Sequence, residues 1–371
     1  MTKRLHKPDY VFFGIASFLF LFGILMLASA STVIAYERFQ NSSYYLTHQL
    51  LFGALPGVVL FLIMYSIDYH LWRRWVRFLF PLSLLLLILV FIPGVGVSYG
   101  RAQNWFSLGG FSFQPIELVK LTFVLYLALW LEERESLIQN TKGVFLPFLV
   151  LLGIVGGLIV LQPDLGGFLI VAMIALLMYF VAGAPWWQFG AIGSAGAALL
   201  AFVILAAPYR LSRLITFLNP DFDKLGVGYH VQQALLAVGS GGFFGLGLGQ
   251  SRQKFLYLPE VIGDSIFAII AEELGFIVTT LFVLLWIVLL VRGFHIAKNA
   301  PDTFGWYTSI GLTVWLVVQA FVNMGAMVRV FPLTGVTLPL VSYGGTSLVI
   351  TLAAIGLLLN ISRHTIVEKK K

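Results

Sequence analysis

The sequence lacks cysteine altogether and has few charged residues. Without cysteine, the chain can form neither a disulfide framework nor a thiolate metal site. Only 11% of its 371 residues are Asp, Glu, Lys or Arg, whereas 59% are hydrophobic and the mean hydropathy is +0.94. A soluble globule of this size needs more polar side chains to cover its surface. The composition therefore excludes a soluble domain and predicts a polytopic membrane protein.

Ten apolar segments are long enough to cross a bilayer. The expected spans are residues 10–35, 48–67, 78–94, 115–131, 144–161, 165–183, 188–207, 265–291, 304–328 and 345–361. The first segment ends in small residues and resembles a cleaved signal peptide, but it is long for one and the later spans need its crossing. We predict an all-α fold with about ten transmembrane helices. Residues 1–371 form one integral-membrane domain, with a long extracytoplasmic loop, residues 208–263, between spans 7 and 8.

Basic residues are distributed unevenly between the two sides of these spans. With a cytoplasmic N-terminus, fourteen Lys and Arg residues fall in inside segments, and the short outside loops hold only Arg38, Arg101 and Arg329. Cytoplasmic loops are enriched in basic residues, so we expect both termini in the cytoplasm. The net charge of +7 therefore encodes topology and does not indicate a nucleic-acid partner.

Asp264 is the candidate catalytic residue. It stands between the polar, basic and aromatic residues 252–263 and the apolar run 265–291. A helix that begins here places the carboxylate at the membrane boundary, near the positive end of the helix dipole. One interpretation is an N-cap that favours the charge. The other is a catalytic group, and the other polar groups expected at the same face of the membrane favour it.

Other polar residues are expected at this outer face. Glu117 and Lys120 are one helical turn apart at the start of span 4, where they can pair. Ionisable groups at membrane depth are functional candidates, and the alternative is an ion pair that only orients two helices. Asp164 is expected to cap the next helix. Residues 332–345 contain glycines and prolines that break a helix, so this segment is expected to close the mouth of the site.

The long loop contains two recognisable segments. Residues 229–238 are expected to form a short amphipathic helix lying on the membrane. The glycine-rich residues 239–249 lack the Gly-Lys-Ser/Thr ending of a nucleotide loop. They are therefore either a hinge or re-entrant turn, or a contact with a lipid phosphate. Glu272 and Glu273, two turns beyond Asp264, are expected to hold neighbouring helices.

These motifs occur in one order along nearly the whole chain, which resembles the SEDS family (shape, elongation, division and sporulation) of bacterial cell-wall proteins. The resemblance rests on residues 104–105, 114–120, 162–166, 217–220, 228–229, 253–254, 257–260, 264, 272–275, 338–339 and 342–345. The long loop is more similar to the division members than to the elongation members. The departures from the family's usual residues are Gly263 and Ser265 beside Asp264, Ile116 for Ser, and Gly167 for Thr.

The resemblance implies an enzyme of the bacterial cytoplasmic (inner) membrane. Members of the SEDS family have ten spans. They polymerise lipid II, a disaccharide-pentapeptide on undecaprenyl diphosphate, into glycan strands outside the membrane. It also implies a class B penicillin-binding protein (a transpeptidase) as partner, with divisome or elongasome proteins and membrane lipids around it. By position, Asp264 matches the family's catalytic aspartate, and Glu117 and Lys120 match its charged pair.

A glycosyltransferase needs a base for the attacking sugar hydroxyl and cations for the leaving diphosphate. Asp264 is expected to be that base, or to bind a divalent cation, Mg²⁺ or Mn²⁺, beside the diphosphate. The candidates to neutralise the diphosphate are Arg101, Lys120, Arg210 and Lys254. Glu117 and Ser342 are further candidate substrate-binding residues.

Two other functions remain open for such a chain. A lipid II flippase needs polar groups along a path to both faces, whereas here the polar groups gather on the outer side and no internal repeat is evident. A scaffold that only positions a penicillin-binding protein gives Asp264 and the basic loop no role.

Overall fold

The computed structural model describes residues 6–99, 102–108, 111–205, 211, 215–219 and 226–364. Its described helices are α1 Tyr10–Phe39, α2 Tyr44–Gln49, α3 Leu55–Ser66, α4 Tyr69–Leu89, α5 Pro115–Glu132, α6 Leu146–Leu161, α7 Leu165–Val181, α8 Trp186–Leu205, α10 Val227–Ser240, α11 Ile266–Lys298, α12 Thr303–Met327 and α13 Gly345–Arg363. Short π-helical segments, Leu50–Ala54 and Thr141–Phe145, join α2 to α3 and precede α6, and Glu135–Leu137 form a 3₁₀ turn. Three strands are β1 Gly96–Tyr99, β2 Ala102–Leu108 and β3 Phe111–Phe113.

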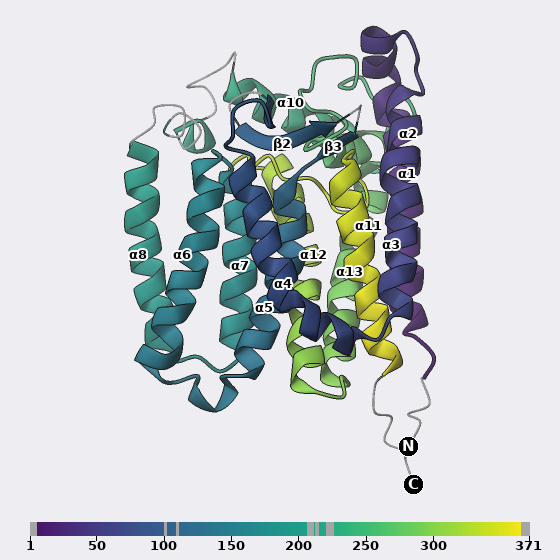
Figure 1. The fold of residues 1–371 in the computed structure, drawn as a ribbon. Helices are drawn as coiled ribbons and strands as arrows, with labels where there is room; N and C mark the ends of the chain where they lie inside the picture. The colour runs from purple at the N-terminus through teal and green to yellow at the C-terminus, as the bar shows by residue number, and fades with distance from the viewer. Residues whose placement is uncertain are drawn as a thin grey trace.

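The ten predicted spans coincide with ten helical segments that run side by side (Figure 1). Six of them, within the described ranges, are long and apolar enough to cross a membrane by these criteria alone: residues 10–39, 44–66, 141–161, 266–298, 303–327 and 345–363. The other four, α4, α5, α7 and α8, run alongside them in the bundle. The helix of the third span, α4, begins at Tyr69 rather than at residue 78. Asp68 accepts a hydrogen bond from His70 N and caps a basic turn that precedes the apolar run.

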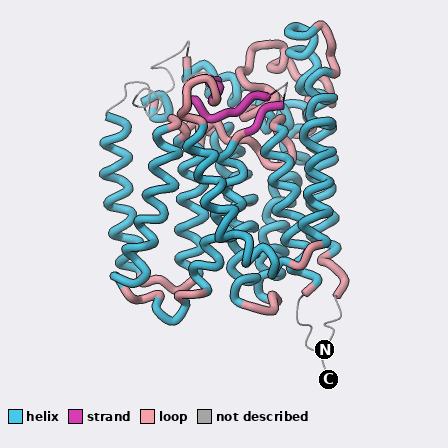
Figure 2. The backbone as a smooth tube through the Cα atoms, viewed as in Figure 1, coloured by secondary structure: helices cyan, strands magenta, loops and turns pink. Residues whose placement is uncertain are grey.

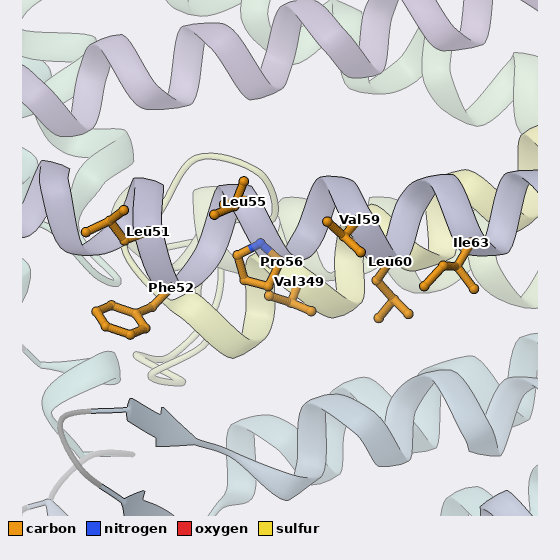
Figure 3. A pocket seen from close by; sticks show the side chains of 8 residues that line it. All are labelled: Leu51, Phe52, Leu55, Pro56, Val59, Leu60, Ile63 and Val349. Carbon is orange, nitrogen blue, oxygen red and sulfur yellow. The ribbon is translucent and has the colours of Figure 1, made fainter.

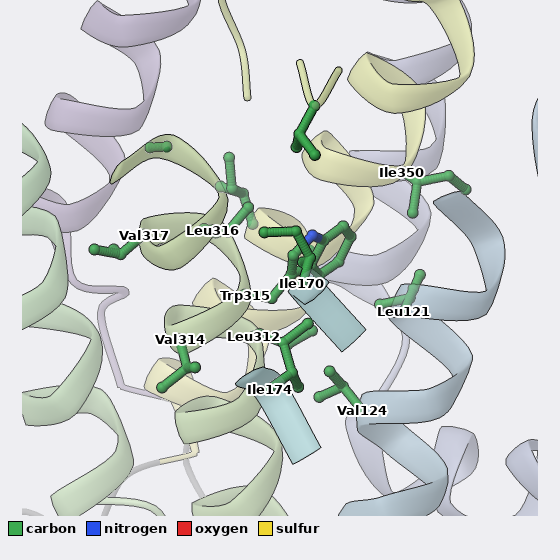
Figure 4. Close-up of a cluster of buried hydrophobic side chains, with 14 of the residues drawn as sticks. Leu121, Val124, Ile170, Ile174, Leu312, Val314, Trp315, Leu316, Val317 and Ile350 are labelled. Atoms are coloured by element: carbon green, nitrogen blue, oxygen red, sulfur yellow. The ribbon is translucent and has the colours of Figure 1, made fainter. Parts of the chain in front are cut away.

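Helix α12 lies at the centre of the bundle. It is buried along nearly its whole length and packs against α5, α7, α11 and α13. Figure 4 shows Leu312 and Trp315 of α12 close to Ile170 and Ile174 of α7 and to Val124 of α5. A helix that is apolar on all sides belongs in the interior of such a bundle. This buried helix is the rigid support for the side chains described below.

A small antiparallel sheet covers one end of the bundle, opposite the end where both chain termini lie (Figure 2). Its strand order is β1-β2-β3, and Phe106 of β2 is paired with Phe113 of β3. The all-α prediction missed this sheet. The helical class itself is correct, because the strands are short and lie outside the spans.

Helix α11 is interrupted at Gly275, where φ is 74° and ψ is 178°. The glycine-rich residues 241–249 pack into this break. Leu246 N donates to Glu272 O at 3.0 Å, and Phe276 N donates to Gly242 O at 2.8 Å. Backbone groups freed within a membrane must be satisfied by protein, and the loop does this here. The glycine-rich segment therefore forms a turn packed against α11, as expected for the re-entrant turn that the sequence analysis gives as one interpretation.

Candidate functional site

Asp264 lies two residues before the start of α11, at the end of the bundle that carries the sheet. The helix begins at Ile266, so Ser265 and not Asp264 occupies the N-cap position. The Ser265 hydroxyl does not cap the helix; it lies 2.6 Å from His230 Nε2 and 2.8 Å from Pro259 O. The Asp264 side chain is partly exposed. A position just before the N-cap places the carboxylate near the positive end of the helix dipole.

The two residues before Asp264 are bound by residues 342–343, just before α13. Ser342 Oγ donates to Gly263 O at 2.7 Å, and Tyr343 N donates to Ile262 O at 2.8 Å. The segment 332–345 therefore closes over this end of the bundle beside Asp264, as the sequence predicts. Ser342, a predicted substrate-binding residue, uses its hydroxyl proton to hold the backbone next to Asp264.

Glu117 and Lys120 form the predicted ion pair at the start of α5. Lys120 Nζ lies 2.8 Å from Glu117 Oε1, and both residues are no more than 5% exposed. The ammonium also donates to Gln319 Oε1 at 2.7 Å and lies 5.3 Å from the Trp315 ring centre. Glu117 Oε2 has no hydrogen-bond partner among the residues that the structure describes. The pair thus retains one free acceptor at the site.

Asp164 caps α7, as the sequence predicts. Its Oδ1 accepts from Gly167 N at 2.7 Å. Burial raises the pKa of the Asp164 carboxyl, against the opposing effects of this hydrogen bond and of the nearby Lys120. Two of the departures from the family pattern meet here: a Cβ on Gly167 would lie 2.2 Å from Ile116 Cδ1. The larger residue at 116 therefore fills the space left by the smaller residue at 167.

Lys254 is buried away from Asp264, under the re-entrant turn. Its ammonium contacts Glu273 Oε1 at 3.0 Å, Gly249 O at 2.6 Å and Ser29 Oγ at 3.4 Å. Ser29 also donates to Glu273, so this carboxylate links α1, α11 and the loop, which agrees with its predicted structural role. An ammonium has three donors, and all three are used here. A contact between Lys254 and a diphosphate would require this ion pair to open.

The predicted residues Arg101 and Arg210 lie outside the described residues. Asp264, Glu117, Lys120 and Ser342 are brought to one end of the bundle. Sequence reasoning missed Gln319 and Asn323, which link them: Gln319 Nε2 donates to Thr337 O at 3.0 Å, and Asn323 Nδ2 donates to Val336 O at 2.7 Å. The sequence contained one signal for these two residues: they are amide side chains four residues apart within an apolar span.

The described residues contain no group of three or more His, Asp or Glu side chains that could hold a metal ion. An apolar groove of about 620 Å³ lies between the α2–α3 segment and α13 (Figure 3). The residues that line it are Leu51, Phe52, Leu55, Pro56, Val59, Leu60, Ile63 and Val349. At one end, the Phe52 ring lies 4.7 Å from His48, whose Nδ1 is 2.9 Å from the Tyr343 hydroxyl. The groove therefore leads to the segment that closes the site.

Fold and site together define a polytopic membrane protein with a carboxylate and a buried ion pair at the end opposite its termini. Residues 9–366 match the family described as "Cell cycle protein" (FTSW_RODA_SPOVE). The chain belongs to this family, as the SEDS motifs indicate. It is a multi-pass protein of the bacterial inner membrane.

Two relatives match almost end to end. Stage V sporulation protein E of Bacillus subtilis (strain 168) is 42% identical over 365 residues, which cover 98% of this chain and 100% of that protein. A probable peptidoglycan glycosyltransferase FtsW of Trichlorobacter lovleyi is 41% identical, with 97% of this chain and 94% of that protein covered. Similarity thus extends to both division and sporulation members.

Solved structures agree with the fold. A chain from work on structural coordination of polymerization and crosslinking by a peptidoglycan synthase complex has a TM-score of 0.80 and 31% identity, covering 96% of this chain and 98% of that chain. The rod shape determining protein RodA of Thermus thermophilus has a TM-score of 0.69 and 30% identity, covering 97% and 98%.

Proposed function

We propose that this protein is a peptidoglycan glycosyltransferase that polymerises lipid II at the outer face of the cytoplasmic membrane. The observation that carries the proposal is the placement of Asp264. The carboxylate stands at the mouth of the bundle on a backbone held from two sides, at the end opposite the basic, terminus-bearing end. The names of the relatives support the same reaction class.

In this reaction Asp264 is the general base. It takes the proton of the acceptor's sugar 4-hydroxyl as that oxygen attacks the donor's anomeric carbon. The bond between that carbon and the diphosphate breaks, and the diphosphate leaves with its electron pair. General-base assistance is typically worth about 10²- to 10⁴-fold in rate.

Cations must stabilise the charge that develops on the leaving diphosphate. Lys120 is the described candidate, because its ammonium is beside the site and has a donor beyond the two that reach Glu117 and Gln319. Arg101 and Arg210 remain predicted contacts. The described residues contain no group of three acidic or His side chains that could hold a metal ion, so a divalent cation beside Asp264 would be held mainly by the diphosphate, since Mg²⁺ commonly binds one or two carboxylates and substrate phosphates. Such an ion supplies further charge neutralisation.

The apolar groove beside α13 is the proposed site for the prenyl tail, because its lining is apolar and its Phe52 end lies beside His48, which contacts Tyr343. The proposed protein partner is a class B penicillin-binding protein, within a division or elongation complex. The structural match to a chain of a synthase complex that couples polymerization and crosslinking supports this pairing.

The test uses purified protein and fluorescent lipid II in detergent. We expect the unchanged chain to form polymer and Asp264→Asn to form none while keeping its thermal midpoint, because an amide cannot accept the proton. The control is Asp68→Asn, which alters an exposed capping acid at the opposite end and should leave polymer formation intact. Polymer from Asp264→Asn would contradict the role of this residue. Absence of polymer from the unchanged chain, combined with lipid II transport in vesicles, would favour a flippase.

A further inference from the structure

Asn323 is a buried amide whose side chain donates one hydrogen bond to the backbone of Asp264 and one to the segment 332–345. It lies on α12 and is 1% exposed. Its Nδ2 donates to Asp264 O at 2.8 Å and to Val336 O at 2.7 Å, which uses both protons. Its Oδ1 has no partner in the described part of the chain. The side chain therefore ties the carbonyl of the candidate base to the segment that closes the site.

Asn323 extends from helix α12, which is buried along nearly its whole length. Gln319, one turn before Asn323, donates to the carbonyl of Thr337, the residue after Val336. Two amides four residues apart thus hold two consecutive carbonyls, which fixes the register of the closing segment on a buried helix. Gln319 also accepts from Lys120. The same helix face therefore sets the positions of both Lys120 and Asp264.

The backbone of Asp264 needs such support because it lies outside α11. With the bonds from Ser342 and Tyr343, the amide of Asn323 completes a set of three held carbonyls, those of residues 262, 263 and 264. The closing segment also reaches the carboxylate itself, since a Cβ on Gly335 would lie 3.6 Å from Asp264 Oδ2. A shift of residues 335–336 would therefore move the surroundings of the carboxylate.

We propose that Asn323 is a positioning residue for Asp264: it fixes the base relative to Lys120, so that the carboxylate stays within reach of the acceptor hydroxyl. This inference rests on the proposed function. A general base must lie within hydrogen-bond distance of the proton it removes. A displacement of about 1 Å can cost about 10²-fold in rate. Asn323 touches neither reacting group and acts through the backbone of Asp264.

The chain contains a matched control for the loss of such an amide. Asn360 on α13 is also 1% exposed, and its Nδ2 donates to two carbonyls at the end of α3, Tyr65 O at 2.7 Å and Ile67 O at 2.8 Å. Its Oδ1 also accepts from Tyr69 N. These contacts lie at the end of the bundle that carries the termini. Asn360→Ala therefore removes at least as much buried hydrogen bonding, at a distance from the site.

The experiment measures the thermal midpoint, kcat and KM for lipid II of Asn323→Ala, Asn360→Ala and Asp264→Asn. We expect both alanine variants to lower the midpoint, because each leaves buried carbonyls unpaired. Only Asn323→Ala should lower kcat, by about 10- to 100-fold, with KM changed less than about 2-fold. Asn323→Ser retains one donor and should fall between, which supplies a second variant if the alanine variant does not fold.

Equal kcat for Asn323→Ala and Asn360→Ala, per folded molecule, would overturn the inference and leave Asn323 a structural residue. A rise in KM at constant kcat would also overturn it, by indicating a contact with substrate. Asp264→Asn distinguishes a failure of the inference on Asn323 from a failure of the proposed role of Asp264. If it is inactive while Asn323→Ala is normal, only the inference fails; if it still forms polymer, the role of Asp264 in the proposed function fails as well.

Discussion

At the scale of single residues, the residue type found at several positions of this site is explained by the side chains that it contacts. Ile116 and Gly167 each depart from the family's usual residue, yet they face each other and their sizes compensate. Glu117 and Lys120 are each costly to bury alone, and together they are paired and hydrogen-bonded. The sequence predicts this pair because residues three apart are neighbours on the surface of a helix, where opposite charges can meet. It could not predict Gln319, which approaches from a helix about two hundred residues later.

The Glu117–Lys120 pair predicts the stability of three variants. Glu117→Ala or Lys120→Ala leaves one buried charge unpaired, so each should lower the free energy of unfolding by about 3–5 kcal/mol. The double variant removes both charges and should be less destabilised than either single variant. Thermal midpoints and lipid II binding, measured on all three proteins, test this. Lost lipid II binding in Lys120→Ala would support the proposed contact with the diphosphate, and a normal midpoint in that variant would contradict the structural role of the pair.

At the scale of elements, periodicity and length predicted the helices well, but not what interrupts or covers them. The amphipathic helix in the long loop is present as α10, and all ten spans are helical. The break at Gly275 was missed, because one glycine in an apolar run is normally tolerated in a helix. The break exists because residues 241–249 approach it from another part of the chain. The sheet was missed for a related reason, since its strands are short and stabilise each other only when paired.

Gly275→Ala tests whether the re-entrant turn needs this break. A Cβ at Gly275 would lie 2.2 Å from Gly245 N, and its φ and ψ are accessible almost only to glycine. We expect a loss of about 3 kcal/mol or more in the free energy of unfolding, from strain and backbone displacement together. The control is Gly183→Ala, which has φ of 87° but nothing within 4 Å of its Cβ. It should cost only about 1–2 kcal/mol. Equal thermal midpoints for the two variants would contradict the close packing of the turn against α11.

At the scale of the whole molecule, the two ends of the helical bundle carry different groups of residues. One end carries both termini and ion pairs of basic residues, including Arg73 with Glu132 and Arg292 with Asp9. The other carries the sheet, Asp264 and the closing segment. Composition and charge predicted this division, because hydropathy and the positive-inside rule act on short local segments. The approach of α12 to both Lys120 and Asp264 depends on how distant helices pack, which no local pattern encodes.

The orientation of these two ends in the membrane is the most general prediction. The proposed reaction needs Asp264 outside, because glycan strands lie outside the membrane, and the distribution of basic residues requires the same orientation independently. The chain has no cysteine, so a single cysteine can be placed at Ser107 in the sheet or at Ser136 between α5 and α6, both exposed. On intact cells, a membrane-impermeant thiol reagent should label Ser107→Cys and leave Ser136→Cys unlabelled until the cells are opened. Labelling of Ser136→Cys with protection of Ser107→Cys would place Asp264 in the cytoplasm, away from the growing glycan, and would rule out the polymerase.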